Sequence, residues 1–166
     1  MLNGSASSPN ASVGRVWSSS ALIDAAPSEV LDALTDPALI ARWSPVGFEL
    51  EHLDGRRLRS GSHARITGTA AGVKSSFEVE VLQADDDGLE LRARGPVDMT
   101  VAYRLADCAE GTSVQATIAL QQRRGMTAQL LRAATAALLN QGALDQALAQ
   151  LAGGVAASGV GASLAA

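Results

Sequence analysis

The hydrophobic period of the sequence changes near Gly125, and this change limits the fold more than any other feature. Between Val46 and Leu120 apolar residues alternate with polar ones, whereas from Met126 to Leu151 they recur at helical spacing. Alternation is typical of strands with one buried face, and helical spacing is typical of an amphipathic helix. About twenty-six helical residues span roughly 39 Å, and a ten-residue strand spans about 33 Å. One long helix can therefore cover a whole sheet.

Short strands separated by turns occupy the region before this helix. The clearest is VKSSFEVEVL, in which Phe77 and Val79 alternate with glutamates. The segments DDDG at residues 85–88 and EGT at 110–112 are typical of turns. This regular spacing predicts an antiparallel meander.

The N-terminal part of the pattern is interrupted by two short helices. Val13 to Ile23 is a plausible first strand, and Pro27 then suits the first turn of a helix. Asp36 and Pro37 restart the helix as N-cap and first helical residue, and WSP at residues 43–45 ends it. One long helix on an antiparallel sheet leaves one end of the rolled sheet open. We expect the two short helices to plug that end.

These elements resemble a known group of proteins. The stretches IDAAPSEVLDALTD, ARWSP and EGTSV, followed by a long amphipathic helix, resemble the SRPBCC superfamily. This is the START, Bet v 1 and polyketide cyclase/dehydrase group of helix-grip proteins, and the nearest branch is that of polyketide cyclases and lipid transport. The resemblance implies an α+β fold in which a curved antiparallel sheet wraps one long C-terminal helix. It also implies a cavity between sheet and helix that holds a small apolar or amphipathic molecule.

The candidate cavity residues are those whose spacing directs them toward the helix or the sheet. On the strands, period-two parity points a set of apolar side chains inward, and on the helix, two leucines share the apolar stripe. The set is Trp17, Phe77, Val79, Met99, Val101, Tyr103, Ile118, Leu131 and Leu138. Plain core packing is an alternative for each of them. Tyr103 is the chain's only tyrosine, and its hydroxyl bonds either a backbone or water partner or a ligand.

The sequence offers no constellation that is typical of catalysis or metal binding. His52 and His63 lie on separate strand segments without metal-ligand spacing. The DDDG turn lacks the later glutamate of a calcium loop, and nucleotide-binding and hydrolase motifs are absent. Cys108 is the only cysteine and follows an aspartate, which disfavours a nucleophile. We therefore predict no catalytic residue, no metal and no cofactor.

The composition and charge of the chain limit the classes of partner that we expect. The net charge of −4 and the pI near 5.1 disfavour a nucleic-acid partner. The uncharged stretch from Gln146 onward contains too few large apolar residues for a membrane span. A single cysteine permits no intramolecular disulfide. We expect a cytoplasmic, bacterial protein, and we leave its oligomeric state open, with a homodimer among the alternatives.

The expected organisation is a single domain with two tails. Residues 1–12 are predicted to be a disordered leader, residues 13–152 the helix-grip domain, and residues 153–166 a flexible tail rich in Ala, Gly and Ser. The first hypothesis for function is binding of a small hydrophobic or amphipathic molecule that is lipid-, polyketide- or aromatic-like. The alternatives are an aromatase/cyclase-type enzyme acting on a polyketide-like substrate, and a non-catalytic structural or regulatory protein with a collapsed cavity.

Overall fold

The computed structural model describes residues 14–70, 72–121 and 125–163. The first part of the chain runs through β1 (Val16–Ile23), α1 (Pro27–Thr35), α2 (Pro37–Trp43), β2 (Phe48–Leu53), β3 (His63–Ala70) and β4 (Val73–Asp85). It continues through β5 (Gly88–Arg94), β6 (Met99–Cys108), β7 (Gly111–Leu120), α3 (Met126–Asn140) and α4 (Ala143–Ser163). The predicted leader, residues 1–12, lies outside the described residues, as do residues 164–166 of the predicted tail.

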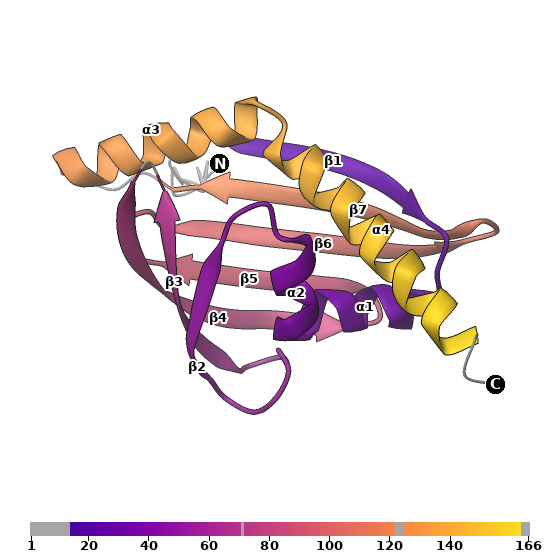
Figure 1. The fold of residues 1–166 in the computed structure, drawn as a ribbon. Helices are drawn as coiled ribbons and strands as arrows, with labels where there is room; N and C mark the ends of the chain where they lie inside the picture. The colour runs from indigo at the N-terminus through magenta and orange to yellow at the C-terminus, as the bar shows by residue number, and fades with distance from the viewer. Residues whose placement is uncertain (1–13, 71, 122–124, 164–166) are drawn as a thin grey trace, which may run out of the picture.

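In the described part of the chain, seven strands form one antiparallel sheet with the order β1-β7-β6-β5-β4-β3-β2. β2 to β7 follow one another as the predicted meander, while β1 lies at the far edge and pairs with β7. Register shifts between Leu50 and His52 on β2 and between Val81 and Gln83 on β4 are of the kind that bends strands. The sheet is curved, and the helices lie over one of its faces (Figure 1). The predicted fold class is confirmed.

The two short helices form because the sequence supplies a start signal for each. Pro27 opens α1, and Pro37 opens α2 after Asp36, whose carboxylate accepts a hydrogen bond from the Ala38 amide at 2.9 Å. The predicted N-cap is therefore confirmed. Helix α1 contacts α4 and several strands, and α2 also contacts α4. The pair thus fills the space between one end of the sheet and the last helix (Figure 1).

A tryptophan completes the end of α1. Pro37 has no N–H, so the Ala33 carbonyl lacks its usual helical donor four residues later. The Trp43 indole Nε1 donates to this carbonyl oxygen at 2.9 Å, and Trp43 is buried. The bond ties α2 to α1 and fixes the direction of the indole ring.

The C-terminal helical region is one helix in the sequence prediction, with Gly142 favouring a bend, and the structure divides it at that glycine into two helices. α3 ends at Asn140, and Gly142 has φ +88°, a left-handed conformation that glycine adopts without strain. α4 then starts at Ala143 in a new direction and crosses the sheet obliquely (Figure 1). The predicted end of the helix near Leu151 is wrong, because α4 continues to Ser163. Val155 is buried, and its apolar contacts stabilise α4 beyond Gly153 and Gly154.

The main hydrophobic core lies between the sheet, α1 and α4. Its most deeply buried members come from β1, β4, β7 and the two helices, and they are Ile23, Val30, Leu34, Val81, Val114, Leu148 and Leu151. The Ser19 hydroxyl of β1 donates to the Asp145 carboxylate near the start of α4. This core holds α4 firmly on one part of the sheet and leaves α3 as the cover of the other part.

Candidate ligand-binding cavity

A cavity of about 350 Å³ lies between the concave face of the sheet and the helices. Its helical wall comes from Leu34 of α1, Ile40 and Trp43 of α2, Leu131, Thr135, Leu138 and Leu139 of α3, and Ala143, Leu144 and Ala147 of α4. Its sheet wall comes from Gly68, Thr69, Ser75, Phe77, Leu89, Leu91, Met99, Val101, Tyr103 and Ile118. Ser44, Pro45, Val46, Leu58 and Val97 complete the lining from the connecting segments.

The side chains that face the space do not fill it. Phe77, Met99, Val101 and Ile118 point inward but are only half-buried. Gly68 contributes no side chain, and a Cβ added there would meet no heavy atom closer than 3.6 Å. A protein interior is normally packed without voids of this size. The void therefore has the dimensions of a small-molecule site rather than of a packing defect.

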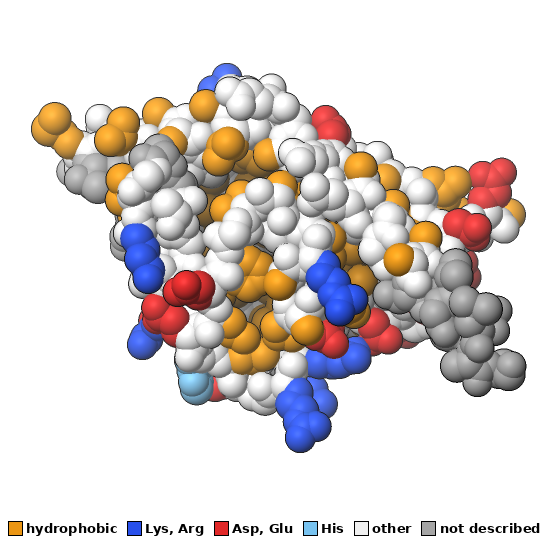
Figure 2. All heavy atoms as spheres, viewed as in Figure 1, with side chains coloured by type: hydrophobic (Ala, Val, Ile, Leu, Met, Phe, Trp, Pro, Cys, Tyr) orange, Lys and Arg blue, Asp and Glu red, His pale blue; other side chains and the backbone are white. Residues whose placement is uncertain are grey.

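The cavity opens to solvent between the α2–β2 connection and α3. Val46 and Leu138 both line the cavity, and they are 40% and 41% exposed. Thr69 near the end of β3 is also exposed and lies in the lining. Figure 2 shows hydrophobic side chains gathered in a hollow in the middle of this face. An apolar molecule can therefore reach the interior without passing a ring of charges.

Seven of the nine predicted cavity residues line the cavity. They are Phe77, Met99, Val101, Tyr103, Ile118, Leu131 and Leu138. Period-two parity located the five on the sheet, and the helical stripe located the two leucines. The parity argument works here because β4, β6 and β7 are regular over the stretches concerned.

Two predicted residues lie elsewhere. The Trp17 indole Nε1 donates to the Asn140 side-chain oxygen at 2.9 Å, so Trp17 holds the end of α3 on β1. Val79 is buried in a small cluster with Ala64 and Ala93, and Leu53 and Ile66 pack against it. Both residues have the predicted parity, but neighbouring side chains separate them from the void.

Sequence reasoning missed the wall formed by α2 and the segment after it. Ile40, Trp43, Pro45 and Val46 all contribute to this wall, whereas the sequence analysis placed only a helix end here. The WSP stop was the available signal, since it turns the chain sharply back toward the sheet. Which side of the turn faces the interior depends on the packing of α2 against α4.

Tyr103 is the most buried polar group of the lining. It lies in the middle of β6 between Leu89 of β5 and Ala116 of β7, and it is 7% exposed. Its ring meets the Trp43 ring edge to face, with centroids 6.1 Å apart. The hydroxyl has no hydrogen-bond partner among the described residues, and its oxygen keeps some accessible surface. Burial raises the pKa of Tyr103 to about 12, because the phenolate would lose its hydration.

Two of the other hydroxyl groups of the lining are hydrogen-bonded within the described residues. The Ser44 hydroxyl donates to the Val46 carbonyl at 2.9 Å, and the Thr135 hydroxyl donates to the Leu131 carbonyl at 2.9 Å. Among the described residues, no acidic, basic or imidazole side chain lines the cavity. The arrangement can bind an apolar molecule and donate a hydrogen bond to it from Tyr103, with Ser75 and Thr69 as further hydroxyls of the lining.

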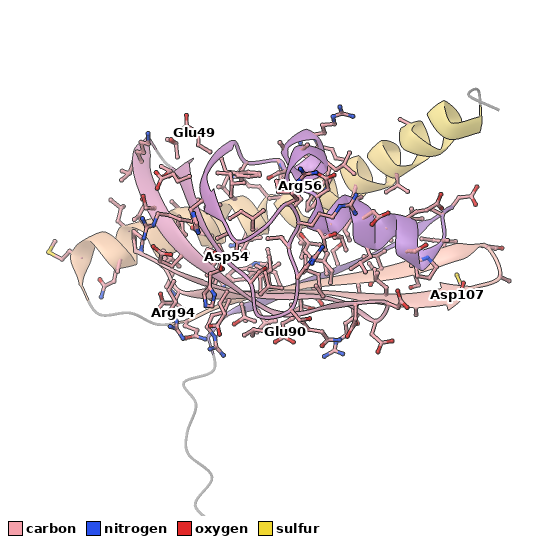
Figure 3. The ribbon with its side chains drawn as sticks, turned by 90° about the horizontal axis from the view of Figure 1, so that it is seen from below. Glu49, Asp54, Arg56, Glu90, Arg94 and Asp107 are labelled. Atoms are coloured by element: carbon pink, nitrogen blue, oxygen red, sulfur yellow. The ribbon has the colours of Figure 1, made fainter. Side chains whose placement is uncertain are left out.

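Charged groups lie on the outside of the molecule. Arg65 and Glu78 pair across β3 and β4 at 2.6 Å, and Glu90 and Arg94 project from the face of the sheet that the helices do not cover (Figure 3). His52 binds Asp54 at 3.0 Å, and this hydrogen bond lowers the pKa of the carboxyl group. Within residues 14–70, 72–121 and 125–163, no group of His, Cys, Asp and Glu side chains has an arrangement that could hold a metal ion.

A family model matches most of the chain. The model described as polyketide cyclase/dehydrase and lipid transport covers residues 15–155. No curated protein matches the chain. None of the helices in the described residues combines the length and hydropathy needed to cross a bilayer.

Solved structures share the fold at low sequence identity. Protein CV1439 from Chromobacterium violaceum is 21% identical, with a TM-score of 0.62 over 84% of this chain and 96% of that chain. TTHA0849 from Thermus thermophilus is 19% identical, with a TM-score of 0.65 over 87% of this chain and 99% of that chain. DynU16, from the dynemicin biosynthetic locus, is 20% identical, with a TM-score of 0.54 over 82% of this chain and 45% of that chain.

Proposed function

Because the chain belongs to the polyketide cyclase/dehydrase and lipid transport family, we propose that it binds a small, largely apolar molecule in the cavity between sheet and helices. The main observation in support of the proposal is a cavity of about 350 Å³. None of the described residues that line this cavity has a charged side chain. The ligand in this proposal contacts Phe77, Met99, Val101 and Ile118 from the sheet and Leu138 from α3.

The physical basis for affinity is burial of apolar surface in a space that already exists. Each buried CH₂ group contributes about 0.8 kcal/mol, and a preformed cavity needs little reorganisation of the protein. Affinity should therefore rise with the apolar size of the ligand until the cavity is full. An empty cavity of this kind leaves part of the surface of half-buried side chains such as Met99 without contacts, and a ligand supplies those contacts.

A catalytic role is the second candidate, in the form of an aromatase/cyclase-type reaction on a polyketide-like substrate. The specific observation in its favour is the Tyr103 hydroxyl, which can donate a hydrogen bond to a substrate carbonyl inside an apolar chamber. Proton abstraction needs a base as well. The described lining supplies no carboxylate or imidazole for that role, so binding is the function we place first.

The proposal includes a cytoplasmic location in a bacterium and no nucleic-acid partner. The supporting observations are a single cysteine and a net charge of −4. Its oligomeric state is left open.

The test uses a substitution that fills the cavity from its glycine. Gly68→Leu adds a side chain toward the void, and no backbone atom obstructs its Cβ. The neutral dye N-phenyl-1-naphthylamine, whose fluorescence rises in apolar surroundings, serves as the probe. We expect the dye to bind the wild type, and Gly68→Leu to weaken binding about tenfold, a loss of 1.4 kcal/mol, with no fall in Tm.

The matched control is Gly153→Leu, at an exposed helical glycine where an added Cβ meets nothing within 4 Å. This variant should bind the dye as the wild type does. Absence of dye binding to the wild type, or equal weakening by both variants, would contradict binding in the cavity.

A further inference from the structure

Tyr103, a buried residue of the cavity wall, has a hydroxyl with no partner among the described residues, and this hydroxyl specifies the ligand further than apolar shape does. We infer that the ligand is an uncharged molecule with a hydrogen-bond acceptor, a carbonyl or ether oxygen, which the Tyr103 hydroxyl binds. The inference rests on the proposed function, since it concerns the occupant of the same cavity.

First, the Tyr103 hydroxyl has a donor that no described group uses. Tyr103 is 7% exposed and lines the cavity, and among the described residues no group accepts a hydrogen bond from its oxygen. A buried hydroxyl is almost always hydrogen-bonded in proteins. The partner must then enter from the cavity, which is the space next to the ring.

Second, the phenol of Tyr103 is held in one direction. Its ring packs edge to face against Trp43, and the Trp43 indole is itself fixed by the bond of 2.9 Å to the Ala33 carbonyl. Leu89 and Ala116 flank Tyr103 on the neighbouring strands, and both are buried. A donor fixed in this way requires the ligand to have an acceptor, and it also requires that acceptor to lie at one position.

Third, the cavity favours an uncharged ligand. A pKa of about 12 keeps the phenol protonated at neutral pH, so it acts as a donor and not as a counter-charge. The described lining contains no charged side chain. An ionised ligand would lose its hydration without compensation, whereas a carbonyl or ether needs the single bond that Tyr103 offers.

A second hydroxyl provides an internal control. Ser75 of β4 lies in the lining opposite Gly68 of β3, is 8% exposed, and also has no partner among the described residues. It is near the β3–β4 end of the cavity and far along the sheet from Tyr103. Ser75→Ala removes a cavity hydroxyl without touching the Tyr103 environment.

The experiment compares three probes with the same naphthalene ring system. They are 2-acetylnaphthalene, which has a carbonyl, 2-ethylnaphthalene, which has a similar shape without it, and 2-naphthoate, which is an anion. Their dissociation constants are measured by displacement of N-phenyl-1-naphthylamine from the wild type, Tyr103→Phe and Ser75→Ala.

We expect the preference for ketone over hydrocarbon to fall about tenfold in Tyr103→Phe, because only the ketone loses a hydrogen bond. The hydrocarbon should bind Tyr103→Phe at least as tightly as the wild type, which also shows that the variant is folded. Ser75→Ala should keep the wild-type preference, and 2-naphthoate should bind the wild type at least about tenfold more weakly than the ketone.

Three results would overturn the inference while cavity binding stands: an unchanged preference in Tyr103→Phe, loss of the preference in Ser75→Ala instead, or equal binding of naphthoate and ketone. Failure of all three probes to displace bound dye would also overturn it. If the dye itself does not bind the wild type, the proposed function fails, and this inference fails with it.

Discussion

The two halves of the space between sheet and helices are built from the same kinds of residue and have opposite outcomes. Under α4, side chains such as Val81, Val114 and Leu148 are at most 1% exposed and form a filled core. Under α3, residues of the same inward parity, such as Val101 and Ile118, are only half-buried and face the cavity. We call these regions the filled half and the hollow half.

Side chains on the inward face of the sheet therefore belong either to a packed core or to a cavity, depending on which helices cover them. The filled half is covered mainly by α1 and α4, whereas the hollow half is covered by α3 and bounded by α2, and the chain changes direction between α3 and α4 at Gly142. Stability should therefore come mainly from the filled half and binding from the hollow half. Four measurements test this contrast between the filled half and the hollow half.

The largest effect is expected from the same truncation in each half. Leu148→Ala in α4 removes a side chain that is 1% exposed and should lower the free energy of unfolding by about 3–5 kcal/mol. Leu139→Ala in α3 faces existing space and should cost about half as much or less. Urea denaturation measures both values. Equal losses at the two positions would remove the distinction between the halves.

The second effect concerns Tyr103 at high pH. Its pKa is about 12 in the folded protein and about 10 when unfolded, so the fold favours the protonated phenol. The stabilisation is complete below pH 10 and is lost as the pH rises through 12, a change of about 3 kcal/mol. Because Tyr103 is the chain's only tyrosine, absorbance at about 295 nm, where phenolate absorbs, reports it alone.

Tyr103→Phe is the control for this titration. It should abolish the absorbance change and remove the corresponding part of the pH dependence of unfolding. A phenolate signal with a midpoint near pH 10 in the folded protein, the ordinary value, would mean that the hydroxyl is open to water and that the cavity is not dry.

The third effect is at Trp43, which belongs to both halves. Trp43→Phe leaves the Ala33 carbonyl without a donor and should lower the free energy of unfolding by about 1–3 kcal/mol. Because the indole also lines the cavity, dye affinity should change as well. Trp17→Phe, which loses a bond to Asn140 outside the cavity, should leave dye affinity unchanged. A change in affinity with Trp17→Phe alone would place the ligand elsewhere.

The smallest effect is expected at the end of α4. Among the side chains that the structure describes, Val155 is the last buried apolar residue of α4, and Ala156 and Ala157 are exposed. Amide hydrogen exchange should be slow up to Val155, and from Ala157 to Ser163 it should approach the rate of an unprotected chain. Uniform protection through Ser163 would contradict the flexible tail that the sequence analysis predicts.

The sequence predicted the fold because each element carries a local signal. Alternation marked β4 and β6, Asp36 and Pro37 marked the start of α2, and the order of elements was sufficient to identify the helix-grip arrangement. Most of the site followed from parity. Trp17 and Val79 did not, because parity gives the face on which a side chain lies but not the neighbours that cover it.

The set of apolar side chains that point toward the helices follows from the amino-acid sequence alone. Period two and helical spacing are properties of the backbone, so they hold before any element is placed. Only the tertiary structure decided which of those side chains would be packed and which would face a void. That outcome depends on where α4 is held by β1, where Gly142 turns α3 away, and how Trp43 joins α2 to α1. These are contacts between separate elements of the chain, and no local pattern encodes them.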